Sequence, residues 1–181
     1  MKTILCFGDS NTLGYDPRDP FGGCCERPWP DLAGELRGRE MINAGSCGRC
    51  IPGSARERAV LLELLADRKP DRLMIMLGTY DILIGREVRQ SIRNMERLLA
   101  QLQEAFPQLP IMVLSPPRMT HSGTEETLEQ LTQGLEQAAG QAGAAFLDCR
   151  GWEIPLAFDG VHFTQDGHDL FARRLADEAW G

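Results

Sequence analysis

The chain has 181 residues, which suits one domain with a single substantial core, so we expect residues 1–181 to form one domain. Its net charge is -7 at pH 7, and its sequence pI is about 5.0. Nucleic acids and anionic membranes attract surfaces rich in Lys and Arg, so this charge argues against both as partners. Small neutral substrates remain open.

The N-terminal residues contain no targeting signal that we can identify. Met1-Lys2 runs directly into an apolar stretch that ends near Asp9, which is too short for a signal peptide. Elsewhere the sequence has no run of about eighteen apolar residues, the length that a membrane-spanning helix requires. We therefore expect a soluble cytoplasmic protein.

In chain order, the sequence predicts five strands that alternate with five helices. The strands are short apolar runs, and the helices have apolar residues at steps of three and four, most clearly over residues 86–106. Thr164 is a predicted N-cap of the last helix. The predicted elements are a strand at 4–7, a helix at 29–36, a strand at 41–42, a helix at 54–66, a strand at 73–77, a helix at 86–106, a strand at 111–114, a helix at 125–141, a strand at 144–147 and a helix at 165–180.

This alternation predicts an α/β fold in which parallel strands are buried on both faces. We expect a three-layer α/β/α sandwich with a five-stranded parallel sheet, of the flavodoxin-like kind, with right-handed crossovers. Ligands of such sheets bind at the carboxyl ends of the strands, where the loops converge. The polar motifs that follow the strands are therefore the candidates for a site.

Four such motifs fall at this edge of the predicted sheet. Gly8-Asp9-Ser10-Asn11 ends the first strand, Asn43-Ala44-Gly45 the second and Gly78-Thr79-Tyr80-Asp81 the third. Asp159 and His162 follow the fifth strand at a spacing of three. The rim would thus combine a hydroxyl, a glycine amide, a polar aromatic ring and a carboxylate–imidazole pair.

These residue types fit acyl transfer by a serine. In that chemistry His162 would take the proton from Ser10, and Asp159 would orient the imidazole and stabilise its charged form. Each residue alone also fits an ordinary turn, and the sequence lacks the G-x-S-x-G elbow because Thr12 stands where its second glycine would be. The backbone amides of Ser10 and Gly45 are the predicted oxyanion donors.

The other candidate groups have simpler interpretations. His121, in a loop, and His168, in the last predicted helix, are expected to have structural or solvent roles. Cys47-Gly48-Arg49-Cys50 has C-x-x-C spacing, but it lacks a second pair for a metal, and Pro52-Gly53 follows where a redox motif would open a helix. We expect reduced thiols and neither a metal nor a cofactor. The cysteines are Cys6, Cys24, Cys25, Cys47, Cys50 and Cys149.

Taken together, the motifs resemble the SGNH, or GDSL-like, hydrolase family over nearly the whole chain. Residues 8–12 are similar to its first block, residues 43–45 to its second, residues 78–81 to its third and residues 159–162 to its last. Residues 4–10, 74–79, 114–117 and 159–164 are most similar to bacterial arylesterases and acyltransferases. The resemblance implies a Ser10–His162–Asp159 triad, with substrate contacts from Tyr80, Asp9 and Asn11.

One residue departs from the family pattern. The third block of the family carries an asparagine that donates to the oxyanion, and this chain has Tyr80 there. The phenol oxygen lies farther from the backbone than an amide, so we expect Tyr80 to line the acyl pocket instead. Losing one oxyanion donor lowers turnover by on the order of 10²–10³, whereas losing the nucleophile can lower it by on the order of 10⁶.

The sequence therefore predicts a cofactor-free serine esterase or acyl hydrolase that acts on short-chain carboxylic esters. Its predicted partner is a small-molecule ester, with no nucleic acid and no membrane, and homo-oligomer formation stays open. A catalytically weakened protein that binds a carbohydrate or acyl ligand is the alternative that Tyr80 suggests. If the protein is an enzyme, the next candidate substrates are acetylated sugars, which would make it a carbohydrate O-deacetylase. Thioesters or lysophospholipids come after these.

Overall fold

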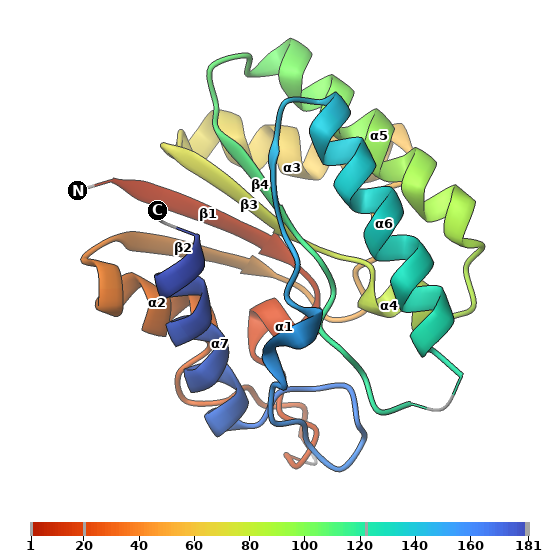
Figure 1. Cartoon of the computed structure of the whole chain (residues 1–181). Helices are drawn as coiled ribbons and strands as arrows, with labels where there is room; N and C mark the ends of the chain where they lie inside the picture. The colour runs from red at the N-terminus through yellow and green to blue at the C-terminus, as the bar shows by residue number, and fades with distance from the viewer. Residues whose placement is uncertain (1, 20, 122, 180–181) are drawn as a thin grey trace.

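The computed structural model describes residues 2–19, 21–121 and 123–179, and its centre is a five-stranded parallel sheet (Figure 1). The strand order is β2-β1-β3-β4-β5. Because the first connection runs to one side of β1 and the later ones to the other, the order reverses between β1 and β3. The strands are β1 (Thr3–Gly8), β2 (Glu40–Gly45), β3 (Arg72–Met76), β4 (Ile111–Leu114) and β5 (Ala145–Leu147).

Helices cover both faces of the sheet (Figure 1). Helices α2 and α7 pack together on one face, and α5 packs on α6 on the other face, which α3 also covers. Two shorter helices, α1 and α4, follow β1 and β3. The bounds are α1 (Ser10–Leu13), α2 (Trp29–Arg37), α3 (Ala55–Arg68), α4 (Thr79–Leu83), α5 (Val88–Ala105), α6 (Glu125–Gln141), the 3-10 helix η1 (Arg150–Trp152) and α7 (Gln165–Glu178).

The core has two parts, one on each face of the sheet, because the side chains of a strand alternate between its faces. Leu5 and Phe7 of β1 belong to the part under α3, α5 and α6, and Ile4 and Cys6 to the part under α2 and α7. All four side chains are at most 3% exposed. The structure thus confirms the predicted three-layer sandwich with a five-stranded parallel sheet.

The structure has the predicted number of strands, and most predicted elements begin and end within a few residues of the observed ones. Thr164 caps α7 as predicted, since its side chain accepts a hydrogen bond from the backbone N–H of Gly167. Ser54 stands before α3 instead of within it, and forms a capping box with Glu57. The sequence missed α1, α4 and η1, and the predicted end of the last helix at Trp180 lies outside the described residues.

Candidate active site

The carboxyl ends of β1 and β3 meet at the point where the strand order reverses. Gly8 pairs with Met76 there, and α1 and α4 begin just beyond these strands. A crevice outside the carboxyl ends at such a reversal is the usual ligand site of open parallel sheets. The first and third polar motifs therefore lie at the place where the fold predicts a site.

Ser10, His162 and Asp159 form a hydrogen-bonded row at this edge. Ser10 Oγ lies 2.9 Å from His162 Nε2, and His162 Nδ1 lies 2.6 Å from Asp159 Oδ2. Ser10 is the first residue of α1, whereas the other two residues follow β5 about 150 positions later. The fold therefore assembles the hydroxyl, imidazole and carboxylate that the sequence singled out.

The carboxylate of Asp159 is held by its own loop. Its other oxygen, Oδ1, accepts hydrogen bonds from the backbone N–H groups of Val161 at 3.0 Å and His162 at 3.1 Å. Burial by itself raises the pKa of Asp159, but the hydrogen bonds from the ring and backbone of His162 and from Val161 outweigh burial and lower it. Asp159 is therefore ionised at neutral pH and favours an N–H on Nδ1, which leaves Nε2 free to accept the serine proton.

Asn11 joins α1 to the loop of His162. Its side-chain Nδ2 donates to the carbonyl oxygen of Val161 at 3.1 Å, and its Oδ1 accepts from the backbone N–H of Phe163 at 3.0 Å. Asn11 is only 1% exposed. The predicted contact of Asn11 with substrate is therefore wrong: both ends of its amide are bound within the protein, and it fixes the serine relative to the histidine.

Asp9 is also buried beneath the site and not at its surface. It is 1% exposed, and its Oδ1 accepts from the backbone N–H of Asn11 at 3.0 Å. Burial raises the pKa of Asp9 to about 6, although the hydrogen bond from Asn11 opposes the shift. The predicted contact of Asp9 with substrate is wrong for the same reason as that of Asn11, because substrate cannot reach a covered carboxyl group.

Gly45 has a different role from the predicted one. Its backbone N–H donates to Asn43 Oδ1 at 2.9 Å, so this amide is already used within the protein. A Cβ at Gly45 would lie 2.1 Å from the backbone nitrogen of Leu13, which shows how closely α1 sits on β2. The prediction of Gly45 as an oxyanion donor is corrected accordingly: glycine is needed here so that the helix carrying Ser10 can approach the sheet.

The turn that follows β2 carries a second glycine, which the sequence interpretation passed over. Gly48 has a φ of +69°, a left-handed conformation that favours glycine. A Cβ at Gly48 would lie 3.6 Å from Cε1 and Cζ of Tyr80. Among the described residues, neither the Gly48 nor the Ser10 backbone N–H has a hydrogen-bond partner. In the sequence, Gly48 is only a glycine in a turn-prone segment, and many glycines of that kind have no functional role.

Both sides of this turn are anchored. The guanidinium of Arg49 lies over the ring of Phe7 and donates to the carbonyl oxygens of Gly8, the last residue of β1, and Ala44, the residue before the last of β2. On the far side, the backbone N–H of Ile51 donates to Asp81 Oδ2 at 2.9 Å. Residues 46–51 are thereby fixed to the ends of three strands, because Asp81 follows β3.

Asp81 is itself a buried hub of polar contacts. Its Oδ1 accepts from Ser91 Oγ at 2.9 Å and from Arg86 Nη1 at 2.8 Å, in addition to the bond that its Oδ2 makes to Ile51. It is 1% exposed, whereas the preceding Tyr80 is 39% exposed. Asp81 therefore holds α4 in place while Tyr80 faces the solvent side of the site.

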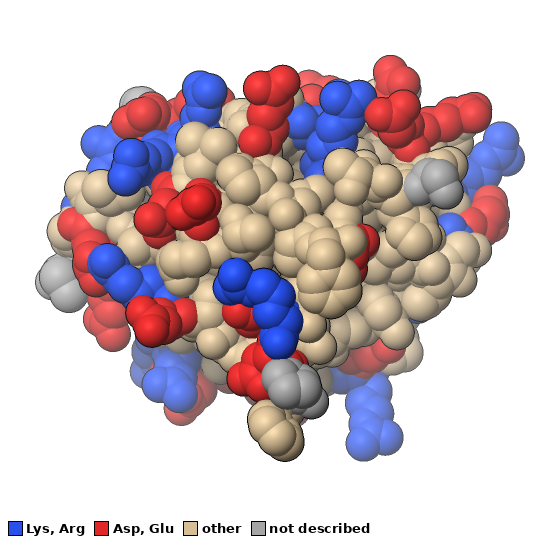
Figure 2. Space-filling view, turned by 90° about the horizontal axis from the view of Figure 1, so that it is seen from below, with Lys and Arg blue, Asp and Glu red and all other residues tan. Residues whose placement is uncertain are grey.

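The rim of the site carries aromatic side chains. Tyr15 lies edge-on to His162, with ring centroids 4.9 Å apart, and Phe158, next to Asp159, is 80% exposed. Figure 2 views the molecule from the side of these loops and shows a broad area of uncharged residues on that face, with charged side chains around it and a few near its centre. Such a surface suits an uncharged substrate.

The other candidate groups of the sequence lie outside the Ser10–His162–Asp159 row. His168 is fully buried, its Nδ1 accepts from the backbone N–H of Trp29, and burial lowers its pKa to about 4. The six cysteines are free thiols, and the described residues contain no group of His, Cys, Asp and Glu side chains arranged to hold a metal. The structure records no contact between His121 and either Ser10 or His162; the backbone carbonyl oxygen of His121 accepts from Thr124 Oγ1.

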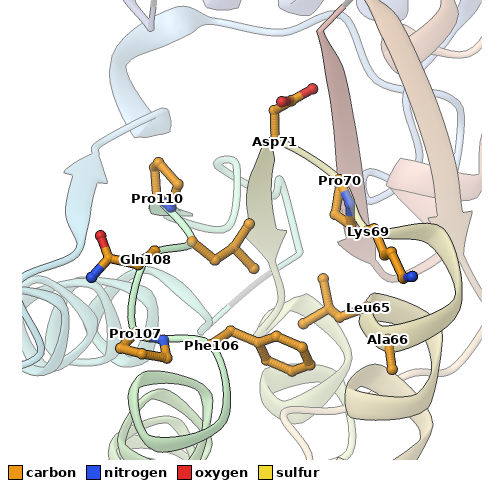
Figure 3. A pocket seen from close by; sticks show the side chains of 10 residues that line it. Leu65, Ala66, Lys69, Pro70, Asp71, Phe106, Pro107, Gln108 and Pro110 are labelled. Carbon is orange, nitrogen blue, oxygen red and sulfur yellow. The ribbon is translucent and has the colours of Figure 1, made fainter.

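A pocket of about 510 Å³ lies away from these residues, at the amino-terminal edge of the sheet (Figure 3). It is formed between the end of α3 and the segment that follows α5, and Leu65, Phe106 and Pro107 are among its apolar side chains. Lys69 and Asp71 lie at its margin. This edge carries none of the polar motifs, so the pocket is separate from the candidate active site.

A hydrogen-bonded serine–imidazole–carboxylate row at the carboxyl edge of a parallel α/β sheet is an arrangement suited to ester hydrolysis. A sequence model of the GDSL-like Lipase/Acylhydrolase family matches residues 6–170. The chain therefore belongs to that family and is a carboxylic ester hydrolase of the SGNH type. No curated protein sequence matches it.

Solved structures support the same assignment over the full length of the chain. A proposed arylesterase from Agrobacterium tumefaciens is 27% identical, with 99% of this chain and 98% of that chain covered and a TM-score of 0.81. The aryl esterase of M. smegmatis is 25% identical, with the same coverage and a TM-score of 0.81. A carbohydrate acetylesterase from Sinorhizobium meliloti, at 22% identity, covers 99% and 98% and shares the fold with a TM-score of 0.82. None of the described helices is long and apolar enough to cross a membrane.

Proposed function

We propose that this protein is a serine esterase that cleaves short-chain carboxylic esters through an acyl-enzyme intermediate on Ser10. The observation that carries the proposal is the row of hydrogen bonds from Ser10 through His162 to Asp159, at 2.9 and 2.6 Å. Both distances lie within the range that proton transfer between a nucleophile and its base requires.

In the first half-reaction, Ser10 Oγ attacks the ester carbonyl carbon while His162 Nε2 takes the hydroxyl proton. The carbonyl oxygen becomes an oxyanion, and the Ser10 and Gly48 amides donate to it, since both N–H groups lack a partner within the described residues. The C–O bond to the alcohol then breaks, and His162 returns its proton to the leaving oxygen. Asp159 stabilises the imidazolium throughout.

In the second half-reaction, water replaces the alcohol. His162 takes a proton from the water as it attacks the acyl carbon, the bond to Ser10 Oγ breaks, and the proton returns to the serine. The products are a carboxylic acid and the free enzyme. An acceptor alcohol in place of water would give acyl transfer, so the choice between hydrolysis and transfer depends on which of them reaches the acyl group.

Short, neutral acyl esters are the proposed substrates, and the broad uncharged area on the face of the site supports a neutral ester (Figure 2). Aryl acetates and acetylated sugars are the first compounds to test, since an aryl esterase and a carbohydrate acetylesterase share the fold. A cytoplasmic location and a small-molecule partner are part of the proposal. Thioesters and lysophospholipids come after these compounds in the order of testing.

The test is labelling with a fluorophosphonate probe, followed by mass spectrometry to find the modified residue. We expect the label on Ser10, no label in His162→Ala, and a loss of turnover on the order of 10⁶ in Ser10→Ala with an unchanged circular dichroism spectrum. Wild-type turnover in folded Ser10→Ala would refute the assignment.

Ligand binding without turnover is the alternative, and Tyr80 is the observation that favours it, because the family has an asparagine at this position. This alternative predicts no fluorophosphonate label in the folded wild-type protein. It also predicts that an acetylated sugar or a fatty acid binds with the same affinity to the wild type and to Ser10→Ala.

A further inference from the structure

The position of Tyr80 relative to Gly48 gives the phenol a specific chemical role. A Cβ at Gly48 would lie 3.6 Å from Cε1 and Cζ of Tyr80 and 3.9 Å from its hydroxyl oxygen. The ring thus lies alongside the turn, with its hydroxyl end beside Gly48. This differs from the sequence-based expectation of a phenol that extends beyond the oxyanion site.

The distance between the two donors is suited to one shared acceptor. A Cβ is about 2.5 Å from its own backbone nitrogen, so Tyr80 Oη is at most about 6.4 Å from the nitrogen of Gly48. Two donors up to about 6 Å apart can both reach one oxygen with hydrogen bonds of about 3 Å. At any separation up to about 6 Å, which is nearly the whole range below this upper bound, the phenol can donate to the same oxygen atom as the Gly48 amide.

The hydroxyl is also available. Tyr80 is 39% exposed, and no hydrogen bond of its hydroxyl occurs within the described residues. Its helix is held firmly by the contacts of the adjoining Asp81 to Ile51, Arg86 and Ser91. Because Asp81 anchors both α4 and the turn of Gly48, the relative position of the two donors is set before substrate binds, which is what electrostatic stabilisation requires.

We propose that the Tyr80 hydroxyl donates the third hydrogen bond to the oxyanion, together with the backbone amides of Ser10 and Gly48, in the place of the family asparagine. The inference rests on the proposed serine esterase function and deepens it. It also implies that this chain is an active enzyme with an altered donor set. With the phenol beside Gly48, the aromatic ring of Tyr80 forms part of the rim of the site. An aromatic surface there favours planar or apolar acyl groups over charged ones.

The test compares Tyr80→Phe with Tyr80→Asn and with a control on the same helix, Leu83→Ala, whose side chain is 37% exposed. Phenylalanine keeps the ring and removes only the donor, and asparagine restores an amide donor. For phenyl acetate hydrolysis, we expect Tyr80→Phe to lower kcat by on the order of 10²-fold with KM within twofold of wild type. Tyr80→Asn should stay within tenfold of wild type, and Leu83→Ala should be unchanged.

A second readout separates a donor from a side chain that only packs. Binding of a phenylboronic acid, which forms a tetrahedral adduct with a serine, should weaken in Tyr80→Phe by about the same factor as kcat, because the donor acts on the transition state. Wild-type kcat and boronate affinity in folded Tyr80→Phe would overturn the inference, and so would a change in KM alone. Failure of the proposed function looks different, because then Ser10 is not labelled by fluorophosphonate in any variant.

Discussion

The buried carboxyl group of Asp9 makes the stability of the fold depend on pH in a predictable way. Asp9 lies under the nucleophile with 1% exposure, and burial outweighs the hydrogen bonds that favour its ionised form. Burial raises its pKa from 3.8 to about 6. The substitution Asp9→Asn keeps a side-chain oxygen that can accept from the backbone N–H of Asn11, and it removes the charge. It therefore isolates the effect of the ionised carboxylate.

The sign follows from proton binding in the two states. Below about pH 4 the group is protonated in both the folded and unfolded chains, and it has no effect on their difference. As the pH rises from about 4 to 6, the unfolded chain loses this proton first, so the free energy of unfolding falls. Above about pH 6 the loss is complete. A pKa difference of about two units corresponds to about 3 kcal/mol.

The assay is urea unfolding of wild type and Asp9→Asn at several values between pH 4 and pH 8. The difference in free energy of unfolding between the two proteins should shift in favour of Asp9→Asn by about 2–3 kcal/mol from pH 4 to pH 8. Comparing the pH values cancels any change in packing. Asp177→Asn, which removes an exposed carboxylate from α7, is the control. A difference that stays constant with pH, or that grows toward acid, would show that the reasoning is wrong.

The same substitution should slow catalysis. The charge of His162 lowers the pKa of Asp9, because a positive imidazole and the Asp9 carboxylate attract each other. That imidazole is formed during acyl transfer in the proposed mechanism. Asp9→Asn should therefore gain stability relative to wild type between pH 4 and pH 8 and still be the slower enzyme, with a lower kcat for phenyl acetate and a nearly unchanged KM.

Two further substitutions test the packing around the site and in the core. Asn11→Ala leaves two buried backbone groups of the histidine loop unpaired, so it should lower the free energy of unfolding by about 2–4 kcal/mol in urea melts and lower kcat more than it raises KM. Gly134→Ala places a Cβ 2.1 Å from Ile92 Cδ1 and should destabilise the wild-type protein by about 1–3 kcal/mol. In the Ile92→Ala protein, where this clash is absent, the same substitution should be stabilising. Thermal unfolding of wild type, the two single variants and the double variant would measure both effects.

The layers of the fold could be predicted because they depend on repeated patterns. The helix at 125–141 and the strand at 111–114 have the bounds that the sequence predicts, since each is a continuous periodic or apolar segment. Helices α1 and α4 have four and five residues, which is too short for periodicity to be visible. They form because neighbouring segments bind them, and those contacts come from distant parts of the chain.

The sequence predicts those site residues whose side-chain chemistry is specific. It does not predict those whose role depends on where the chain places their backbone groups. Ser10, His162 and Asp159 were recognisable because few other residue types can do their proposed chemistry. The choice between Gly45 and Gly48 as an amide donor depends on which N–H is already used, and the Asn43 side chain that binds Gly45 could be placed only in three dimensions. Tyr15, which lies against His162, gave no signal in the sequence at all.

Most polar residues of the motifs hold the site together and do not contact substrate. Asn11, Asn43 and Asp81 direct their side chains to backbone groups of neighbouring segments, and these bonds keep a four-residue helix and two loops in register. Removing any of them leaves buried groups unpaired. Tyr80 stands between two buried residues but is itself exposed, so its side chain can change without breaking this network. Position 80 can therefore hold a phenol where the family has an amide without disturbing the buried contacts around it, which is the structural condition that the proposed role of Tyr80 requires.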